Sequence, residues 1–458
     1  MITKGANMTT VKFDLSKING KIKHMNAVNN GPSGDPIRKT GNTEYYKALE
    51  IPYARNHDAS FYSVYGGEHT VDVHRIFKNF DADENDPANY LFEPTDQYIE
   101  NTLAVGTKTF YRLGASIEHE HKVGTYPPKD FNKWARICEH IIRHYTEGWA
   151  NGFNYDIEYW EIWNEPDCIN ADGSNPCWQG TPEQFVDFYE VAAKYLKSCF
   201  PHLKIGGPAF MNSKEKSSTN NPIRIMFLDA IKERNIPLDF YSFHGYILSP
   251  EKVKELSDHA VKSFIDRGLP IPELVYDEWN YVRSWSGEGY KYSRYVSKHT
   301  KKGASLIAGA MCAGQKSALD MMMYYDARPC NWCGIFDFDT LEPTKPYYAF
   351  AFFRDIKKLG THVMTTDPEN VFSCGATDGN SHALMLTYYN DDDSITGDVV
   401  KLEFEGIKSE NGVRADFYLI DDDHNGAWVK SELFTAESFA CLVDMKLYDT
   451  YLVKICAL

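Results

Sequence analysis

Two stretches of the sequence place a glutamate among aromatic residues in a way that suits acid–base chemistry. Glu165 lies in IEYWEIWNEPD (157–167), and Glu278 lies in ELVYDEWN (273–280). A carboxyl group that is buried among rings has a raised pKa and favours its neutral form. A neutral carboxyl group paired with an ionised one can break a glycosidic bond, because the acid protonates the leaving oxygen. Two similar sites indicate this chemistry more strongly than one Asn-Glu-Pro does.

Alternating β-rich and helical segments must position these two residues. The sequence predicts strands at 108–114, 157–164, 204–209, 238–246 and 273–280, and helices at 128–148, 181–199, 223–235 and 303–318. Repeated β-then-α units specify a parallel sheet, and this many of them predict an α/β fold, a closed (β/α)8 TIM barrel. A doubly wound open sheet is the alternative, although no Gly-x-Gly-x-x-Gly follows an early strand.

Catalytic groups of such a barrel lie where its strands end. If PYARNH (52–57) is the second strand, Glu165 and Glu278 end the fourth and the seventh. Carboxyl groups about 5–5.5 Å apart would act with retention through a covalent intermediate, and groups about 6.5–9.5 Å apart would act with inversion.

The pattern changes near the end of the barrel segment. Residues 346–458 contain alternating or apolar runs separated by Asn, Asp and Gly turns, which predicts an accessory C-terminal β-sandwich packed against the barrel. Residues 1–22 are strand-like and are expected to join this sandwich. The predicted catalytic barrel therefore covers residues 23–345.

Composition limits the classes of partner. The 458 residues are 43% hydrophobic, so the chain can bury a large core, and the net charge of -16 argues against binding nucleic acid or an anionic membrane. No apolar run approaches the roughly 20 residues of a membrane span. The first ten residues lack the apolar stretch of a signal peptide, so a cytoplasmic location is expected.

Ten cysteines in a chain without a leader are expected to be reduced thiols. Cys330 and Cys333 form a C-x-x-C, but no second pair follows at the spacing of a zinc site. The segment IEHEH (117–121) also lacks the His-Glu-x-x-His spacing of a metal-binding helix. We therefore predict no metal and no cofactor.

Taken together, the motifs resemble glycoside hydrolase family 39, in a clan of retaining enzymes. WEIWNEPD (160–167) is close to the family signature, in which the acid/base glutamate follows Asn on strand four and the nucleophile ends strand seven. Further matching segments follow in the family's order: PYARNH (52–57), TYPPKDFNKW (125–134), KIGGPA (204–209), IPLDFYSFHGY (236–246), VYDEWNY (275–281) and PTKPYYAFAFF (343–353).

The resemblance implies that Glu165 is the acid/base and Glu278 the nucleophile. It also implies that Asn164 binds the hydroxyl next to the anomeric carbon and that Tyr246 orients Glu278. The predicted substrate-binding residues are Asn164, His57, His244, Tyr246, Trp279, Tyr324, Asp326 and Arg328. The expected partner is a carbohydrate, and a homo-oligomer is compatible with the resemblance.

The sugar-recognition segments depart from the family pattern. Family β-xylosidases carry a Trp on strand eight and a Glu pair after it, whereas this chain reads MMMYYDARPCNWCG (321–334), and strand three carries Arg112 where an acidic residue is usual. The expected activity is that of a retaining exo-β-glycosidase resembling β-xylosidase and acting on short oligosaccharides or glycosides. Specificity for galactose, for arabinose in either ring form or for an Arg-held uronic acid remains open, as do endo-acting cleavage and a non-catalytic sugar-binding barrel.

Overall fold

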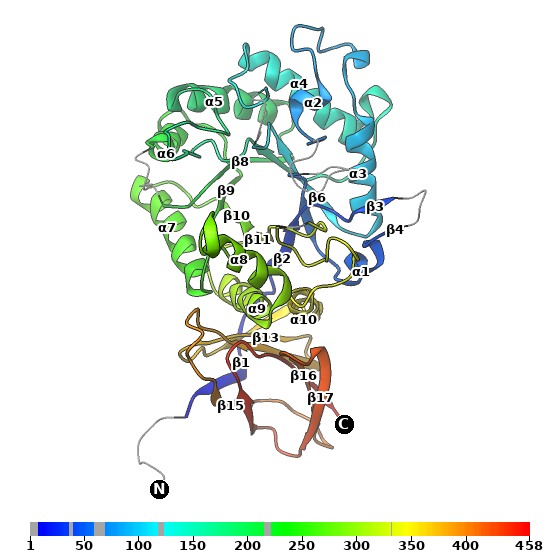
Figure 1. Cartoon of the computed structure of the whole chain (residues 1–458), viewed down its shortest axis with the longest axis vertical. Helices are drawn as coiled ribbons and strands as arrows, with labels where there is room; N and C mark the ends of the chain where they lie inside the picture. Colours follow the sequence, from blue (N-terminus) through cyan, green and yellow to red (C-terminus); the bar gives the residue numbers. More distant parts are fainter. Residues whose placement is uncertain (1–7, 36–39, 59–68, 118–122, 215–220, 331) are drawn as a thin grey trace.

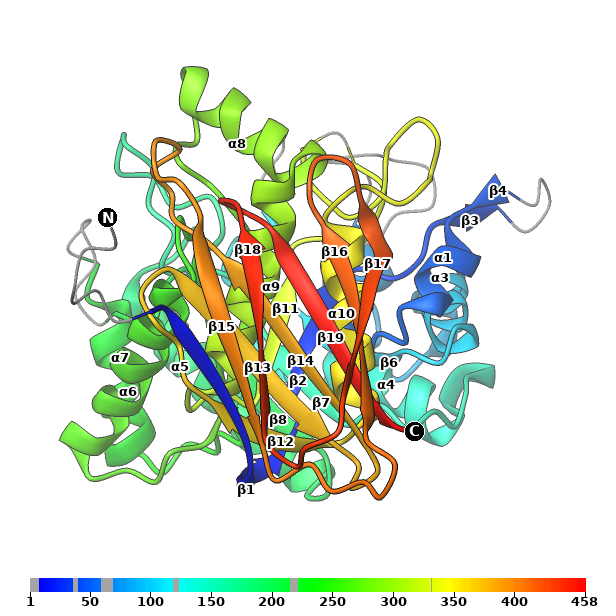
Figure 2. The same cartoon turned by 90° about the horizontal axis from the view of Figure 1, so that it is seen from below.

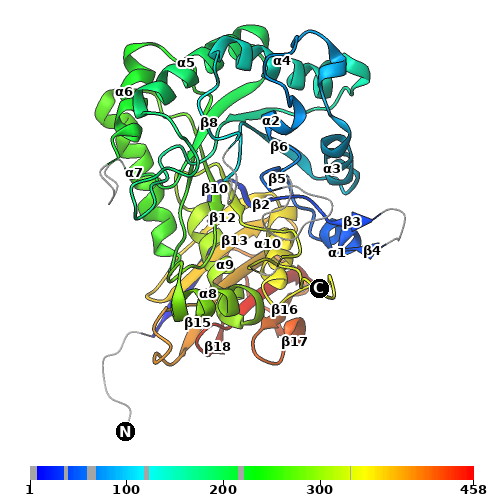
Figure 3. The same cartoon turned by 45° about the horizontal axis from the view of Figure 1, so that its top comes forward.

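A computed structural model describes residues 8–35, 40–58, 69–117, 123–214, 221–330 and 332–458. Eight parallel strands close into a barrel, which confirms the predicted (β/α)8 fold (Figures 1 and 3). In barrel order they are β2 (His24–Asn29), β5 (Tyr53–Arg55), β6 (Lys108–Leu113), β7 (Tyr159–Ile162), β8 (Lys204–Phe210), β9 (Phe240–His244), β10 (Glu273–Trp279) and β11 (Met321–Tyr324).

Helices surround the barrel and also follow its last strand. They are α1 (Thr43–Ala48), α2 (Val73–Ile76), α3 (Glu93–Ala104), α4 (Phe131–Glu147), α5 (Pro182–Cys199), α6 (Ile223–Glu233), α7 (Glu251–Arg267), α8 (Gly287–His299), α9 (Lys301–Gln315) and α10 (Tyr347–Lys358), with short 3-10 turns at Pro87–Asn89 and Trp149–Asn151. Local sequence fixes the ends of the two helices that flank the fourth strand. Asp130 caps α4 by accepting a bond from the Lys133 N–H at 3.0 Å, and Thr181 with Gln184 forms a capping box on α5. These caps fix the first turns of the helices that come before and after β7 along the chain.

The barrel interior is filled by apolar side chains from seven of its eight strands. They are Ala27, Tyr53, Phe110, Tyr159, Phe240, Val275, Met321 and Met323. Alternate residues of the same strands face the helices, because successive side chains of a strand point to opposite sides. Both faces of each strand are therefore buried, as a parallel barrel requires.

The remaining long strands form one nine-stranded sheet below the barrel (Figures 1 and 2). Its order is β17 (Asn425–Phe434), β16 (Val413–Ile420), β19 (Thr450–Ala457), β14 (Ser381–Tyr388), β13 (Val371–Thr377), β12 (Thr361–Thr365), β1 (Thr10–Lys21), β15 (Asp398–Glu405) and β18 (Phe439–Met445). A two-stranded ribbon, β3 (Gly34–Asp35) with β4 (Thr40–Gly41), lies apart from it.

The predicted β-sandwich is not confirmed as two separate sheets, because all nine strands belong to one hydrogen-bonded sheet. Strands from both ends of this sheet share one hydrophobic core, in which Leu402 and Val443 cluster with Phe417 and Val453. The sheet must therefore bend back on itself. The N-terminal strand β1 lies inside it, antiparallel to β12 and parallel to β15.

Helices α9 and α10 lie between the barrel and the nine-stranded sheet (Figure 1). The predicted boundary at residue 346 falls just before α10, and the strands that follow begin at Thr361. Lys302 of α9 is buried and reaches Asp391 at 2.9 Å and Asp393 at 2.8 Å. The two parts thus share a packed and ion-paired interface. Within the described ranges, none of the helices combines the length and the apolarity needed to cross a membrane.

Candidate active site

The two glutamates lie at the carboxyl ends of the fourth and seventh barrel strands. Glu278 belongs to β10, and Glu165 follows the end of β7 by three residues. The Glu165 N–H donates to the Ala209 carbonyl oxygen at 2.9 Å, and its φ of 46° lies in the left-handed region. Residues other than glycine rarely adopt this region, and residues that do so are found more often at functional sites. The local backbone thus holds the carboxyl group in one place.

His244, at the end of β9, lies between the two carboxyl groups. Its Nδ1 is 2.8 Å from Glu165 Oε1 and 3.6 Å from Glu278 Oε2. One oxygen of each glutamate and a ring nitrogen of His244 all lie within 4.8 Å of one another. Carboxyl groups this close favour a retaining geometry over an inverting one, which needs about 6.5–9.5 Å to admit a water molecule.

Burial shifts the pKa values of Glu165, Glu278 and His244. Removal from water raises the pKa of both Glu165 and Glu278 to about 7, and the pKa of His244 falls to about 4 for the same reason. His244 is therefore neutral near pH 7. The positive charge of Arg55 opposes the rise in both pKa values, whereas the negative charge of Asp58 adds to that of Glu165. Glu278 also accepts a hydrogen bond from the Tyr246 hydroxyl, which lowers its pKa. The two pKa values are alike, and the hydrogen bond from Tyr246 is the contact that favours Glu278 as the anion.

Arg55 on β5 is the buried cation of the site. Its guanidinium donates to Glu161 at 2.7 Å and to the Asn164 side-chain oxygen at 2.7 Å, and it lies 3.3 Å from Asp277 and 3.6 Å from Glu278. The bond to Asn164 fixes the amide so that its NH2 group is left as a donor. The sequence reasoning quoted PYARNH but selected only its histidine and so missed Arg55.

Trp279 and Tyr324 do not line this site, which corrects their prediction as substrate-binding residues. Both side chains are fully buried in the core that faces the helices, with ring centroids 5.3 Å apart. Tyr324 also packs on Phe350 of α10. Tyr324 faces outward because it directly follows the inward residue Met323. Trp279 is four residues after the inward Val275, and the irregularity that β10 has between Tyr276 and Glu278 reverses the alternation before it.

His57, Asp326 and Arg328 belong to a buried charged cluster beside the carboxyl groups. Arg328 pairs with Asp326 at 2.9 Å and with Asp58 at 3.2 Å. Tyr325 donates its hydroxyl proton to Asp58, and His57 Nε2 is 3.6 Å from the same aspartate. Neither Asp58 nor Tyr325 was selected from the sequence as a substrate-binding residue, although each is adjacent to a selected one and Tyr325 lies in the altered segment 321–334.

The described residues contain three groups of side chains close enough to hold a metal ion. One is the Glu165–His244–Glu278 group itself, and the others are Glu165 with Cys168 and Cys177, and Asp326 with Cys330 and Cys333. In the last group Asp326 is already paired with Arg328, and Cys333 Sγ contacts the Tyr325 carbonyl oxygen at 3.5 Å. The absence of a metal stays a prediction, and residues 118–121 of IEHEH lie outside the described residues.

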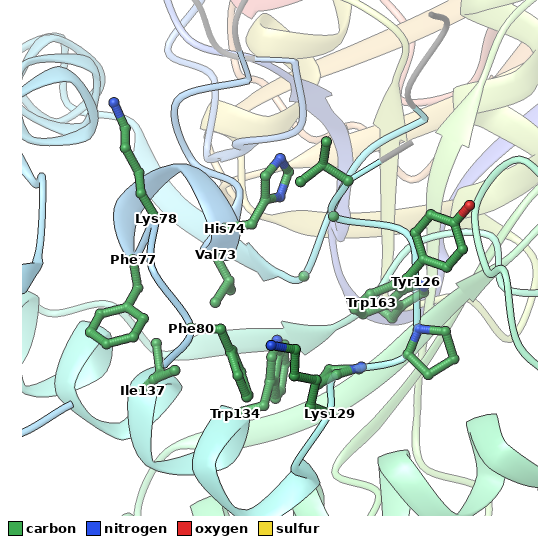
Figure 4. A pocket seen from close by; sticks show the side chains of 15 residues that line it. Val73, His74, Phe77, Lys78, Phe80, Tyr126, Lys129, Trp134, Ile137 and Trp163 are labelled. Atoms are coloured by element: carbon green, nitrogen blue, oxygen red, sulfur yellow. The ribbon is translucent and has the colours of Figure 1, made fainter. Parts of the chain in front are cut away.

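A hollow of about 240 Å³ borders Trp163, which directly follows β7 (Figure 4). Rings of Trp163, Trp134, Phe77 and Phe80 line it, and Lys78 and Lys129 reach its rim. No Asp or Glu is among its lining residues within the described chain. This hollow therefore lacks the pair of groups that the chemistry needs.

A closed parallel barrel with facing carboxyl groups at the ends of strands four and seven is the arrangement of a glycoside hydrolase that uses two carboxyl groups. The model of the glycosyl hydrolases family 39 matches residues 32–367. The chain therefore belongs to glycosyl hydrolase family 39.

Curated relatives resemble this chain in sequence, and solved structures resemble it in fold. A β-xylosidase of Geobacillus stearothermophilus is 30% identical over 221 residues, and one of Caldicellulosiruptor saccharolyticus is 25% identical over 217 residues. These segments cover 46% and 42% of this chain, which spans only 40% and 41% of the two relatives. The structure of a monomeric β-xylosidase from Caulobacter crescentus superimposes with a TM-score of 0.72 at 16% identity, covering 98% of this chain and 100% of that one. A glucosidase from Croceicoccus marinus gives 0.79 at 19%, covering 99% and 100%.

Proposed function

We propose that this protein is a retaining, exo-acting β-glycosidase that hydrolyses short β-xylosides by double displacement. The observation that carries the proposal is the Glu165–His244–Glu278 group, in which two carboxyl groups of raised pKa face one another at the ends of strands four and seven. Membership of family 39 and the names of the two curated relatives support the sugar class.

In the first step the Glu278 carboxylate attacks the anomeric carbon, and the bond from that carbon to the leaving oxygen breaks. Glu165 gives its proton to the leaving oxygen. His244 Nδ1 lies 2.8 Å from Glu165 Oε1, so Oε2 is the oxygen of Glu165 that is left to carry the acid proton to the leaving group. The Asn164 amide, oriented by Arg55, is available to bind the neighbouring sugar hydroxyl as the transition state forms.

In the second step Glu165, now ionised, takes a proton from water. The water oxygen bonds to the anomeric carbon, and the bond to Glu278 breaks to release the sugar and restore the carboxylate. The acid and the base are the same residue, so its pKa must allow both forms near the working pH. A pKa of about 7 for Glu165 supports this dual role.

A neutral sugar suits the charge balance of the pocket. Arg328 is matched by Asp58 and Asp326, and Arg112 donates to Asp72 at 2.5 Å and to the His57 carbonyl oxygen at 2.9 Å. Neither arginine has an uncompensated charge with which to hold a uronate, so these pairs argue against an Arg-held uronic acid.

The test begins with a panel of nitrophenyl glycosides, pyranosides and furanosides of both anomers, in which the β-xylopyranoside should be the best substrate. Proton NMR should show the β-anomer as the first product, and xylo-oligosaccharides should release xylose alone. Preference for another sugar, or release of the α-anomer, would refute the corresponding part of the proposal.

Replacing Glu278 by Ala should abolish turnover, and azide should restore it by forming the α-glycosyl azide on the vacated face. Glu165→Ala should spare substrates with good leaving groups far more than xylobiose, because such leaving groups need no proton. A Glu278→Ala variant that hydrolyses an aryl xyloside at the original rate would remove the assignment.

A further inference from the structure

Three loops at the mouth of the barrel bring a group of aromatic rings next to the nucleophile. Tyr246 follows the sixth strand, Trp285 follows the seventh, and Trp332 follows the eighth. Tyr246 donates its hydroxyl proton to Glu278, and its ring lies 4.7 Å from Trp285 at 82° and 5.9 Å from Trp332 at 79°. A row of rings thus leads outward from the reacting centre.

The two tryptophans stack with their planes 7° apart and their centroids 5.7 Å apart. Trp332 is 9% exposed and also contacts Tyr325, whereas Trp285 is 58% exposed. Because Trp332 lies against one face of Trp285 and Tyr246 meets it edge-on, its exposed surface is largely the opposite face. A large ring that is held rigidly by other rings and open to solvent is typical of a binding surface.

We infer that Trp285, supported by Trp332, is the stacking platform for the leaving-group sugar of the substrate. This inference rests on the proposed function and deepens it. A pyranose presents apolar C–H faces to aromatic rings and keeps its hydroxyls at its edge. The sugar whose bond is broken must contact Glu278, so the next ring of the chain lies farther out, where Trp285 is. The natural substrate is accordingly an oligosaccharide, whose second ring binds this platform.

The test compares xylobiose with β-xylopyranosyl fluoride, which has no second ring, in the unsubstituted enzyme and in Trp285→Ala. The ratio of kcat/KM for xylobiose to that for the fluoride should fall about five- to tenfold, the loss expected for one ring contact. Trp285→Tyr should recover part of the ratio, and it also serves if the alanine variant folds poorly. Trp428→Ala is the matched control, because Trp428 is equally exposed but lies on β17 of the nine-stranded sheet.

An unchanged ratio in Trp285→Ala would overturn the inference. An equal loss on both substrates would overturn it as well, because it would show that Trp285 acts only through Tyr246 on the nucleophile. If the unsubstituted enzyme hydrolyses neither xyloside, the proposed function itself fails. These outcomes separate the two proposals.

Discussion

Replacing Tyr246 by Phe should shift the acidic limb of the pH profile of kcat/KM to higher pH. Burial raises the pKa of Glu278 to about 7, and the bond from the Tyr246 hydroxyl opposes this rise by favouring the anion. Without the phenol, Glu278 keeps His244 Nδ1 and Arg55 Nη1, each 3.6 Å from its Oε2. Its pKa therefore rises further in the variant.

The size of the rise follows from the strength of the lost bond. A hydrogen bond to a charged acceptor contributes about 1.5–3 kcal/mol, and one pKa unit corresponds to about 1.4 kcal/mol. We take the lower end, because the Arg55 guanidinium still stabilises the anion, and expect a rise of about one unit. Since the nucleophile must be ionised, kcat/KM should fall about tenfold on the acidic side and recover as the pH rises.

The measurement is kcat/KM for an aryl xyloside across the pH range, in a stopped assay. The two apparent pKa values of the profile belong to the pair of carboxyl groups together. Tyr324→Phe is the control, because Tyr324 faces the helices and should leave the profile unchanged. A variant whose acidic limb stays in place or moves downward would refute the reasoning, even if its overall rate were lower.

Three further predictions test the cation of the site, the interface and the cysteines. Arg55→Lys should lower the free energy of unfolding in urea by about 3–5 kcal/mol and should reduce kcat/KM severely, because an ammonium group cannot serve all the fixed acceptors of the guanidinium; full activity would contradict this. Lys302→Met should cost about 1–3 kcal/mol in the same measurement, less than a fully buried pair because Asp393 is half exposed, and no loss would contradict the importance of this ion pair. Alkylation of the denatured protein without reductant should add ten groups by mass, because all ten cysteines are free; fewer would reveal a disulfide.

The sequence indicated the two carboxyl groups at the strand ends but not all of the residues around them. Glu165 and Glu278 could be predicted because catalytic groups follow strand ends and because two motifs carried the family signature. Trp279 was selected for its nearness to Glu278 along the chain, yet successive side chains of a strand face opposite sides. In MMMYY both faces of the strand are apolar, so the sequence cannot reveal that Tyr325 rather than Tyr324 faces inward.

The barrel was predictable from its repeated β-then-α units, whereas the second sheet was only partly so. Alternating strands separated by turns predict a β-rich region, but the same pattern suits a sandwich of two sheets and a single sheet that bends back. Hydrogen bonding between β12 and β1, which joins residues about 350 positions apart along the chain, decides between them. Pairings this distant leave no local signal.

The central place of β1 in the second sheet has a consequence for synthesis of the chain on the ribosome. Residues 10–21 emerge before the barrel, but their partners at 361–365 and 398–405 emerge only after the whole barrel has been made. Throughout that time β1 lacks the strands with which it pairs, and an unpaired strand edge is the kind of surface that templates association between chains. Yield of native protein should thus be more sensitive to what is attached ahead of residue 10 than to additions at the surface-exposed carboxyl end.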